Sequence, residues 1–412
     1  MHGRRRHRSF VLSAVALGTF LVLASTSAAA APRWQAFPGK ADPDPGVLTT
    51  GWAANRVWIE GTSKGVPLLW SASPAGRLTS FAQTRVPVDA GIAGPFPIID
   101  GELLMPNSHD GAVGYVTAPL LADGRLGAPR AVPYDDLLAR ARESAAAKLA
   151  NVRILDGLRV GSRLVWALEG TQGAVGLGSF LACCSESGAA VNLTQFIDRH
   201  LGVLFLHIGR DTSGRIWLAW LDRRNYPRAA RGVARILELD PSTLSPSSKA
   251  VAIPGVIADR IDLACAAACR LVAQTAAGDI VSWAPGERSA TRVASAWRLK
   301  VGSEPAWLLA ATFRSGQLVV AYHGNKGKTK YFDATVRDKI RIVRGDARGA
   351  RRRQLAAIPV ANSWPPHKRY GPSDPDVHGT FVPGGLVTVE TFRYTPGVSP
   401  SPLIGAFVPL RP

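Results

Sequence analysis

The sequence has little cysteine, little charge and no long apolar run beyond its N-terminus. Four of its 412 residues are cysteine, and a chain of this length can build its core without disulfide bonds. Charged residues make up 19% and hydrophobic residues 46%, which excludes a largely disordered chain. With 41 glycines and 30 prolines, the composition disfavours long helices and coiled coils and predicts many turns.

Several common enzyme motifs are also absent. The chain has no Walker loop, no G-x-S-x-G nucleophile elbow, no dinucleotide-binding fingerprint and no EF-hand loop. These absences disfavour kinases, serine hydrolases and Rossmann-type oxidoreductases, and we expect no cofactor. Neither His109 nor His323 has a partner at the H-x-x-x-H spacing, so we expect no metal site.

The N-terminus has the pattern of a secretion signal. Four arginines precede an apolar stretch from Phe10 to Ala24, and small residues follow it up to Ala31. A membrane anchor is the alternative, but the apolar stretch is shorter than the roughly 20 residues that a bilayer span needs. We therefore expect residues 1–30 to be a signal peptide and residues 31–412 to form one secreted, extracellular domain that is not transmembrane.

The chain is strongly basic, with a formal net charge of +19. Residues 326–353 contain eleven lysines and arginines against three aspartates. Clustered cations attract anionic polymers, so an anionic envelope polymer is a candidate partner for this segment, and we do not expect nucleic acid to be one. The alternative is that these charges only keep the edge of a sheet solvated.

One sequence pattern recurs seven times. Each copy has an apolar strand, a tight turn that usually contains glycine, and a second strand anchored by an aliphatic residue or tryptophan. The anchors are Trp58, Leu104, Val165, Trp217, Val272, Val319 and Val387, at steps of 46 to 68 residues. A four-stranded blade cannot bury both faces alone, so neighbours must stack around an axis. The sequence predicts an all-β fold, a seven-bladed β-propeller, with six or eight blades as alternatives.

Two details of this propeller follow from the ends and spacing of the repeats. The last repeat ends at its third strand, Leu403–Val408, so its outer strand is expected from the N-terminus, around 35–37 or 46–48. Residues 134–150 are rich in helix formers, with acids at the start and a lysine near the end. They predict one short helix inserted between the second and third blades.

The fourth copy contains the segment Asp211-Thr-Ser-Gly-Arg-Ile-Trp217. This segment resembles the D-x-x-G-x-[IL]-W hairpin of regulator-type propellers and, off by one residue, the Asp box of the sialidase-like superfamily. We expect the aspartate to accept backbone N–H groups across the turn, the glycine to take a left-handed conformation and the tryptophan to pack between blades. The Phe/Tyr-Arg-Ile-Pro signature that a sialidase would show is absent, so the resemblance supports the fold rather than an activity.

Ligand-binding candidates follow the second-strand anchors. In propellers the turns between the second and third strands lie on the face where ligands usually enter, so side chains just beyond each anchor are the best candidates. They are Glu60, Asn107, His109, Glu169, Asp222, Gln274, His323 and Glu390. Convergent carboxylates can hold a cation, a basic ligand or a sugar. The alternative is that these side chains satisfy backbone groups at strand ends, and no residue is assigned a catalytic role.

The four cysteines fall into two pairs. Cys265 and Cys269 flank the turn of the fifth hairpin, so we expect a disulfide between them. Cys183 and Cys184 lie near an outer strand turn of the third blade, too far from the fifth blade to pair with it. They form either a vicinal disulfide or two thiols.

These observations favour binding over catalysis. We expect a secreted β-propeller scaffold at the cell envelope that recognises a glycan, a protein or an anionic polymer. The alternative is an extracellular carbohydrate-active hydrolase or lyase, similar to sialidases, that uses an acidic rim of the central channel.

Overall fold

The structure is a computed structural model in which residues 32–412 form one compact unit. It describes residues 33–41, 47–88, 96–109, 112–132, 149–161, 163–172, 176–184, 190–191, 202–223, 232–243, 246–295, 307–325, 338–359, 375–392 and 403–410. Within these ranges the secondary structure is β-strand and turn, without an α-helix.

The first three groups of strands are separate four-stranded antiparallel sheets, which we call units 1 to 3. Unit 1 contains β2 (Val47–Ala53), β3 (Arg56–Ser63), β4 (Val66–Pro74) and β5 (Leu78–Arg85). Unit 2 contains β6 (Ile98–Ile99), β7 (Glu102–His109), β8 (Ala112–Pro119) and β9 (Arg130–Val132). Unit 3 contains β10 (Leu149–Val160), β11 (Arg163–Gln172), β12 (Gly176–Cys184) and β13 (Ala190–Val191).

Units 4 and 5 share one strand within a seven-stranded sheet. This sheet contains β14 (Gly202–Arg210), β15 (Ile216–Arg223), β16 (Gly232–Leu239), β17 (Val251–Cys265), β18 (Cys269–Thr275), β19 (Asp279–Trp283) and β20 (Thr291–Ser295). The first half of β17, up to Ala258, pairs with β16 as the fourth strand of unit 4. Its second half pairs with β18 as the first strand of unit 5.

The last two units complete the chain. Unit 6 contains β21 (Trp307–Arg314), β22 (Gln317–Asn325), β23 (Asp338–Arg344) and β24 (Arg353–Pro359). Unit 7 contains β25 (Pro375–Val382), β26 (Gly385–Phe392), β27 (Ile404–Pro409) and, as its outer strand, β1 (Gln35–Ala36). Gln35 pairs with Gly405 and Ala36 with Ile404, so the prediction that residues 35–37 supply the missing strand is confirmed. Val47 and Leu48, the alternative, belong to β2.

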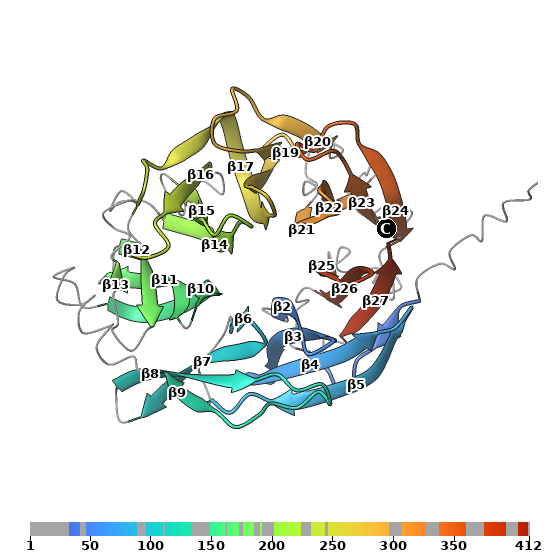
Figure 1. Cartoon of the computed structure of the whole chain (residues 1–412). Coiled ribbons are helices and arrows are strands. Elements are labelled where there is room, and N and C mark those ends of the chain that lie inside the picture. Colours follow the sequence, from blue (N-terminus) through green and yellow to red (C-terminus); the bar gives the residue numbers. More distant parts are fainter. Residues whose placement is uncertain are drawn as a thin grey trace, which may run out of the picture. The chain divides into compact units, whose positions relative to one another are not determined.

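The first strands of the units form a closed cycle (Figure 1). Each of them, in the order β2, β6, β10, β14, β17, β21 and β25, contacts the next, and β25 contacts β2. Four-stranded antiparallel sheets arranged this way are the blades of a propeller, so the β-propeller fold is confirmed. The pairings group the described strands into seven such units.

The predicted helix at 134–150 falls almost wholly on residues that the structure does not describe. Its last two residues, Leu149 and Ala150, pair with β11 as the beginning of strand β10, so the predicted helix extends too far at this end. Cys183 and Cys184 end β12, the third strand of unit 3, which leads to the outer strand β13. Their side chains are outside the described residues.

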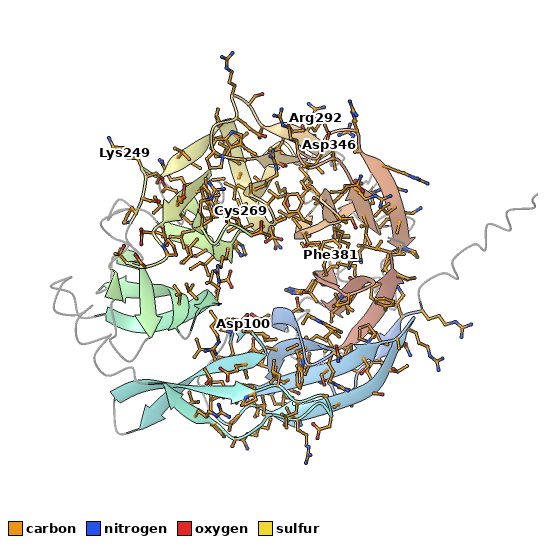
Figure 2. The ribbon with its side chains drawn as sticks, viewed as in Figure 1. Asp100, Lys249, Cys269, Arg292, Asp346 and Phe381 are labelled. Atoms are coloured by element: carbon orange, nitrogen blue, oxygen red, sulfur yellow. A yellow bond between two sulfur atoms is a disulfide. The ribbon has the colours of Figure 1, made fainter. Side chains whose placement is uncertain are left out.

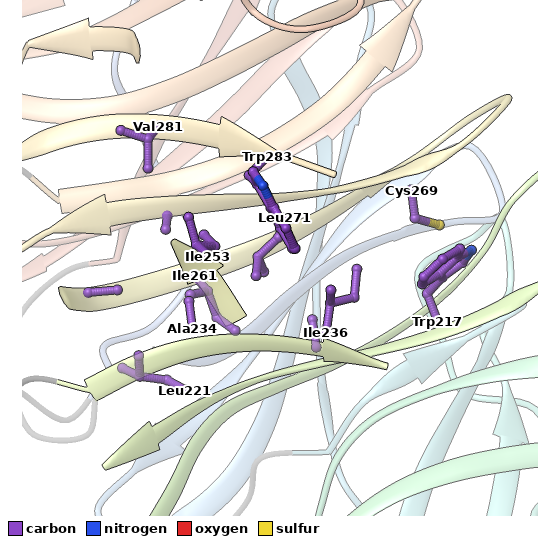
Figure 3. Packing of buried hydrophobic residues seen from close by; sticks show 13 residues of the cluster. Trp217, Leu221, Ala234, Ile236, Ile253, Ile261, Cys269, Leu271, Val281 and Trp283 are labelled. Atoms are coloured by element: carbon purple, nitrogen blue, oxygen red, sulfur yellow. The ribbon is translucent and has the colours of Figure 1, made fainter. Parts of the chain in front are cut away.

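The core lies between the units. Alternate residues of β15 point to opposite sides of the sheet. Trp217 and Leu221 belong to the buried cluster shared with unit 5, where Leu271 and Trp283 face them (Figure 3), whereas Trp220 belongs to a cluster with Val165 of unit 3. Because both faces of β15 are covered, its sequence Ile-Trp-Leu-Ala-Trp-Leu is apolar at every position.

Gly209 in β14 lets units 4 and 5 approach closely. A Cβ atom added at Gly209 would lie 2.6 Å from the Sγ of Cys265 and 3.0 Å from a side-chain carbon of Leu263. Thr212, in the hairpin turn of unit 4, also donates its backbone N–H to the carbonyl of Ala266 in the next hairpin at 2.7 Å. The hairpins of units 4 and 5 therefore pack directly against each other.

The expected disulfide joins Cys265 and Cys269 across the hairpin of unit 5, where the two Cα atoms pair in register and lie 4.0 Å apart. The bond closes a loop of five residues, so its removal is expected to cost about 2 kcal/mol of unfolding free energy. Urea unfolding of the Cys265→Ser/Cys269→Ser variant measures this loss. Reductant applied to the double variant then tests Cys183 and Cys184: a further loss of stability indicates a disulfide between them, and no change indicates two thiols.

Candidate functional site

The structure places the sequence-predicted candidates in the second strands of their units. Asn107 and His109 are in β7, Glu169 in β11, Asp222 in β15, Gln274 in β18, His323 in β22, Glu390 in β26 and Glu60 in β3. All of them lie in the half of the strand that leads to the third strand, as expected. The side chains of Asn107, His109 and Glu169 are outside the described residues.

The five described side chains of this set are buried instead of lining an open rim. Glu60, Gln274 and Glu390 are 0% exposed, Asp222 3% and His323 8%. They also face different neighbours. Glu60 alternates with Val57 and Ile59, which face unit 7, so it lies on the Trp58 side, which packs against unit 2. Asp222 lies on the Trp220 side, which packs against unit 3. Glu60 and Asp222 therefore lie in different interfaces between units, and contact of the five side chains with a ligand stays a prediction.

Glu60 has the most perturbed environment of this set. Neither carboxyl oxygen completes a hydrogen bond within the described part of the chain. Burial raises the pKa of Glu60 to about 8, and the backbone N–H of Phe96 acts weakly in the opposite direction. The carboxyl group is consequently protonated at neutral pH, a state that burial of an acid without a cation partner favours.

Asp222 and Gln274 have structural partners. The Nε of Arg235 in β16 donates to Oδ2 of Asp222 at 2.7 Å. The amide oxygen of Gln274 accepts the backbone N–H of Leu308, in the first strand of the next unit, at 2.8 Å. These bonds match the alternative interpretation of the set, in which polar side chains satisfy groups at strand ends.

A different group of titratable side chains meets on the first strands. Asp156 of β10, His207 of β14 and Asp262 of β17 come from three successive units, and we call them the channel site. The Nδ1 of His207 lies 3.6 Å from Oδ2 of Asp156, and these side chains keep 29% and 31% of their surface exposed. Sequence reasoning missed all three because it examined only the second strands.

β-Bulges precede two of these side chains. The pairing of β10 with β11 shifts between Ile154 and Asp156, and the pairing of β14 with β15 shifts between Leu204 and His207. A bulge adds one residue and redirects the side chains after it, which is common beside functional sites. No simple alternation in the sequence shows where such a shift occurs.

Each aspartate of the channel site also connects its unit to the next. Asp156 accepts the N–H of Gly157 at 2.8 Å and of Ile208, in β14, at 3.0 Å. Asp262 accepts the N–H of Leu263 at 2.7 Å and of Ala311, in β21, at 2.6 Å. The two carboxylates thus make the same pair of backbone bonds, one within their own unit and one to the next unit.

The environment of His207 favours its charged form. Burial lowers the pKa of His207, but the hydrogen bond to Asp156, the charges of Asp262 and Asp156 and the carbonyl of Ile261 together raise the pKa above its usual value. The channel site therefore combines a histidine, whose charged form is favoured, with two aspartates. Such a group can donate and accept protons within one small region.

The hairpin at Asp211 has the predicted chemistry. Oδ1 of Asp211 accepts the N–H groups of Ser213 at 3.0 Å and Arg215 at 3.1 Å, and Oδ2 accepts the indole N–H of Trp217 at 3.2 Å. Gly214 has a φ of 91°, the left-handed conformation that glycine adopts readily. Trp217 packs between units 4 and 5. These contacts confirm the structural role of the hairpin, although they do not assign the chain to the sialidase-like superfamily.

Two kinds of feature are absent from the described ranges. Among these residues, no group of three or more His, Cys, Asp or Glu side chains is arranged to hold a metal ion. No helix within the same ranges is long and apolar enough to cross a bilayer.

Comparisons with known proteins identify similar folds only. No family model matches the chain, and no curated protein matches it significantly. The polysaccharide lyase Uly1 is 9% identical over 92% of this chain and 91% of its own, with a TM-score of 0.49. The α-L-arabinanase of Penicillium chrysogenum, solved with arabinobiose, is 12% identical over 71% and 94%, with a TM-score of 0.45. A thermostable family-43 glycoside hydrolase is 10% identical over 89% and 88%, with a TM-score of 0.35. These identities and TM-scores are too low to transfer an activity to this chain.

Proposed function

We propose that the protein is an extracellular carbohydrate-active β-propeller that binds a glycan at the channel site and cleaves it as a hydrolase or a lyase. The observation that carries this proposal is the meeting of Asp156, His207 and Asp262 on three successive first strands.

The chemistry of the channel site suits a polyhydroxylated ligand. Carboxylate oxygens accept hydrogen bonds from sugar hydroxyls, and an imidazolium donates them. Cleavage of a glycosidic bond by hydrolysis requires a proton donor and a basic or nucleophilic carboxylate. Cleavage by elimination likewise requires an acid and a base. His207 provides the donor, and the partly exposed Asp156 provides the carboxylate.

Binding without cleavage is the second candidate function. It is favoured by the backbone hydrogen bonds that already occupy both oxygens of Asp156 and both oxygens of Asp262. Carboxylates used in this way stabilise the contact between units and leave less capacity for a reacting substrate. A scaffold of this kind would hold a glycan with the same three residues.

Substitution of His207 tests the proposal. The purified mature protein is incubated with a panel of neutral and uronate-containing polysaccharides, and new reducing ends and unsaturated products are measured. We expect His207→Gln to lower the rate by about 10²-fold, the lower range for loss of a general acid. Because His207 must be charged to donate, the wild-type rate should fall as the pH rises through its raised pKa.

The matched control is His378→Gln, which changes a half-buried histidine in the first strand of unit 7. It should retain the wild-type rate. Equal rates for wild type and His207→Gln would reject catalysis at the channel site. Glycan binding that depends on His207, measured by titration calorimetry without turnover on any substrate, would establish the binding scaffold instead.

A further inference from the structure

Six exposed arginines from two neighbouring units lie on one surface. Arg288 and Arg292 come from the end of unit 5. Arg348, Arg351 and Arg352 come from the turn between β23 and β24 of unit 6, and Arg353 begins β24. We call these six residues the arginine surface. Only the last four belong to the basic segment 326–353 that the sequence shows.

Packing between the two units brings the arginines together. A Cβ atom added at Gly349, in the turn of unit 6, would lie 2.7 Å from the side chain of Val293 in β20. The Nε of Arg348 lies 3.6 Å from Oε1 of Glu287 in unit 5. Figure 2 shows Arg292 and Asp346 at the same part of the outer edge. The turn of unit 6 therefore rests directly on unit 5.

The acidic groups near this surface are largely occupied. Both oxygens of Glu287 accept hydrogen bonds from Arg270, at 2.9 and 2.7 Å. Oδ1 of Asp346 accepts the backbone N–H groups of Arg348 and Ala350. Arg292, which is 61% exposed, forms an ion pair with Asp279 at 3.7 Å. The carboxylates therefore leave most of the positive charge of the surface available to a partner.

The composition of the surface selects among anionic partners. The large exposed hydrophobic side chains of the described residues are Leu121, Val251 and Ile257, none of which is in unit 5 after β17 or in unit 6. No aromatic residue occurs in 284–295 or 344–359. The surface thus has no apolar wedge for a bilayer and no ring on which a nucleic-acid base could stack. Arginine forks, in contrast, pair bidentately with sulfate and carboxylate groups.

We propose that the arginine surface binds an anionic polysaccharide bearing sulfate or carboxylate groups. The turn between β23 and β24 and the turn before β20 join third to fourth strands. Because the strands are antiparallel, these turns lie at the end of the units opposite the connections from second to third strands. A polymer held there would leave the opposite end of the units, where second strands connect to third strands, uncovered.

The test measures affinity of the whole mature protein for heparin and for polygalacturonate at increasing salt. We expect Arg351→Gln/Arg352→Gln/Arg353→Gln to weaken binding at least about tenfold at physiological salt and to reduce the salt dependence, because fewer counterions are released. Arg288→Gln/Arg292→Gln should also weaken binding, although these residues are remote from the basic segment in sequence.

The matched control removes the same charge elsewhere. Arg77→Gln/Arg85→Gln/Arg130→Gln changes three exposed arginines of units 1 and 2 and should bind almost as the wild type does. An equal loss in the control would overturn the proposal in favour of unspecific attraction by net charge. Tighter binding to phosphatidylglycerol vesicles or to a single-stranded oligonucleotide than to either polysaccharide would overturn it in favour of those partners.

Discussion

Glu60→Gln is expected to make the protein more stable than the wild type at pH 9 and to leave its stability nearly unchanged at pH 4.5. Burial raises the pKa of Glu60 to about 8 in the folded protein, whereas an unfolded glutamate titrates near 4.3. The folded state therefore holds a proton that the unfolded state releases, and the stability that this provides is fully present below the unfolded pKa. It is lost as the pH rises to the folded pKa.

The size of the stability loss follows from the pKa shift of Glu60. Each unit of pKa difference corresponds to about 1.4 kcal/mol, so the wild type should lose a few kcal/mol of unfolding free energy between pH 4.5 and 8. A glutamine cannot ionise, so the unfolding free energy of Glu60→Gln should not show this loss as the pH rises. Urea unfolding at a series of pH values measures both curves.

Glu238→Gln is the matched control, because Glu238 in β16 is only half-buried. Its unfolding free energy should change with pH in parallel with that of the wild type. If Glu60→Gln also ran parallel to the wild type from pH 4.5 to 9, Glu60 would have to be charged in the folded protein, and the protonated state inferred from its burial would be wrong.

Asp211→Ala is expected to lower the unfolding free energy by about 3 kcal/mol. The carboxylate is fully buried, and its loss leaves the N–H groups of Ser213, Arg215 and Trp217 without their acceptor. Burial alone would raise the pKa of Asp211, but the bonds from Ser213, Trp217 and Arg215 lower it overall. The stability that Asp211 contributes is therefore present at neutral pH and is lost as the pH falls through its folded pKa.

Asp211→Asn keeps the shape of the side chain and removes its charge, so it separates the two contributions to stability. Its amide oxygen can still accept one backbone N–H, so it should lose less stability than the alanine variant. A matched substitution at Asp123, an exposed turn residue of unit 2 that also accepts a backbone N–H from its own turn, should cost much less. If substitutions at Asp211 and Asp123 lowered the unfolding free energy equally, burial of Asp211 would make no additional contribution to stability.

The repeating parts of the fold could be predicted from the sequence. Second strands such as β15 are covered on both faces, so their apolar runs are visible without any contact information. The hairpin at Asp211 is local, and its hydrogen bonds join residues at most six positions apart. The pairing of β1 with β27 followed from an unfilled outer position in the last repeat.

The candidate site could not be predicted from the sequence repeats in the same way. Asp156, His207 and Asp262 are separated by about fifty residues from one another, and each is unremarkable in its own strand. They come together because successive first strands contact around the axis, and bulges before Asp156 and His207 set the direction of their side chains. The second-strand candidates were placed in the correct strands, but alternation alone did not show that neighbouring units would cover them.

Strand β17 belongs to both unit 4 and unit 5, which distinguishes this pair from the other pairs of neighbouring units. Each of the other sheets of the described chain contains the strands of one unit only. Between units 4 and 5 the backbone passes from one ladder into the other at Ala258, so separating the two units would break hydrogen bonds in both sheets simultaneously. We therefore expect β17 to resist the separation of units 4 and 5.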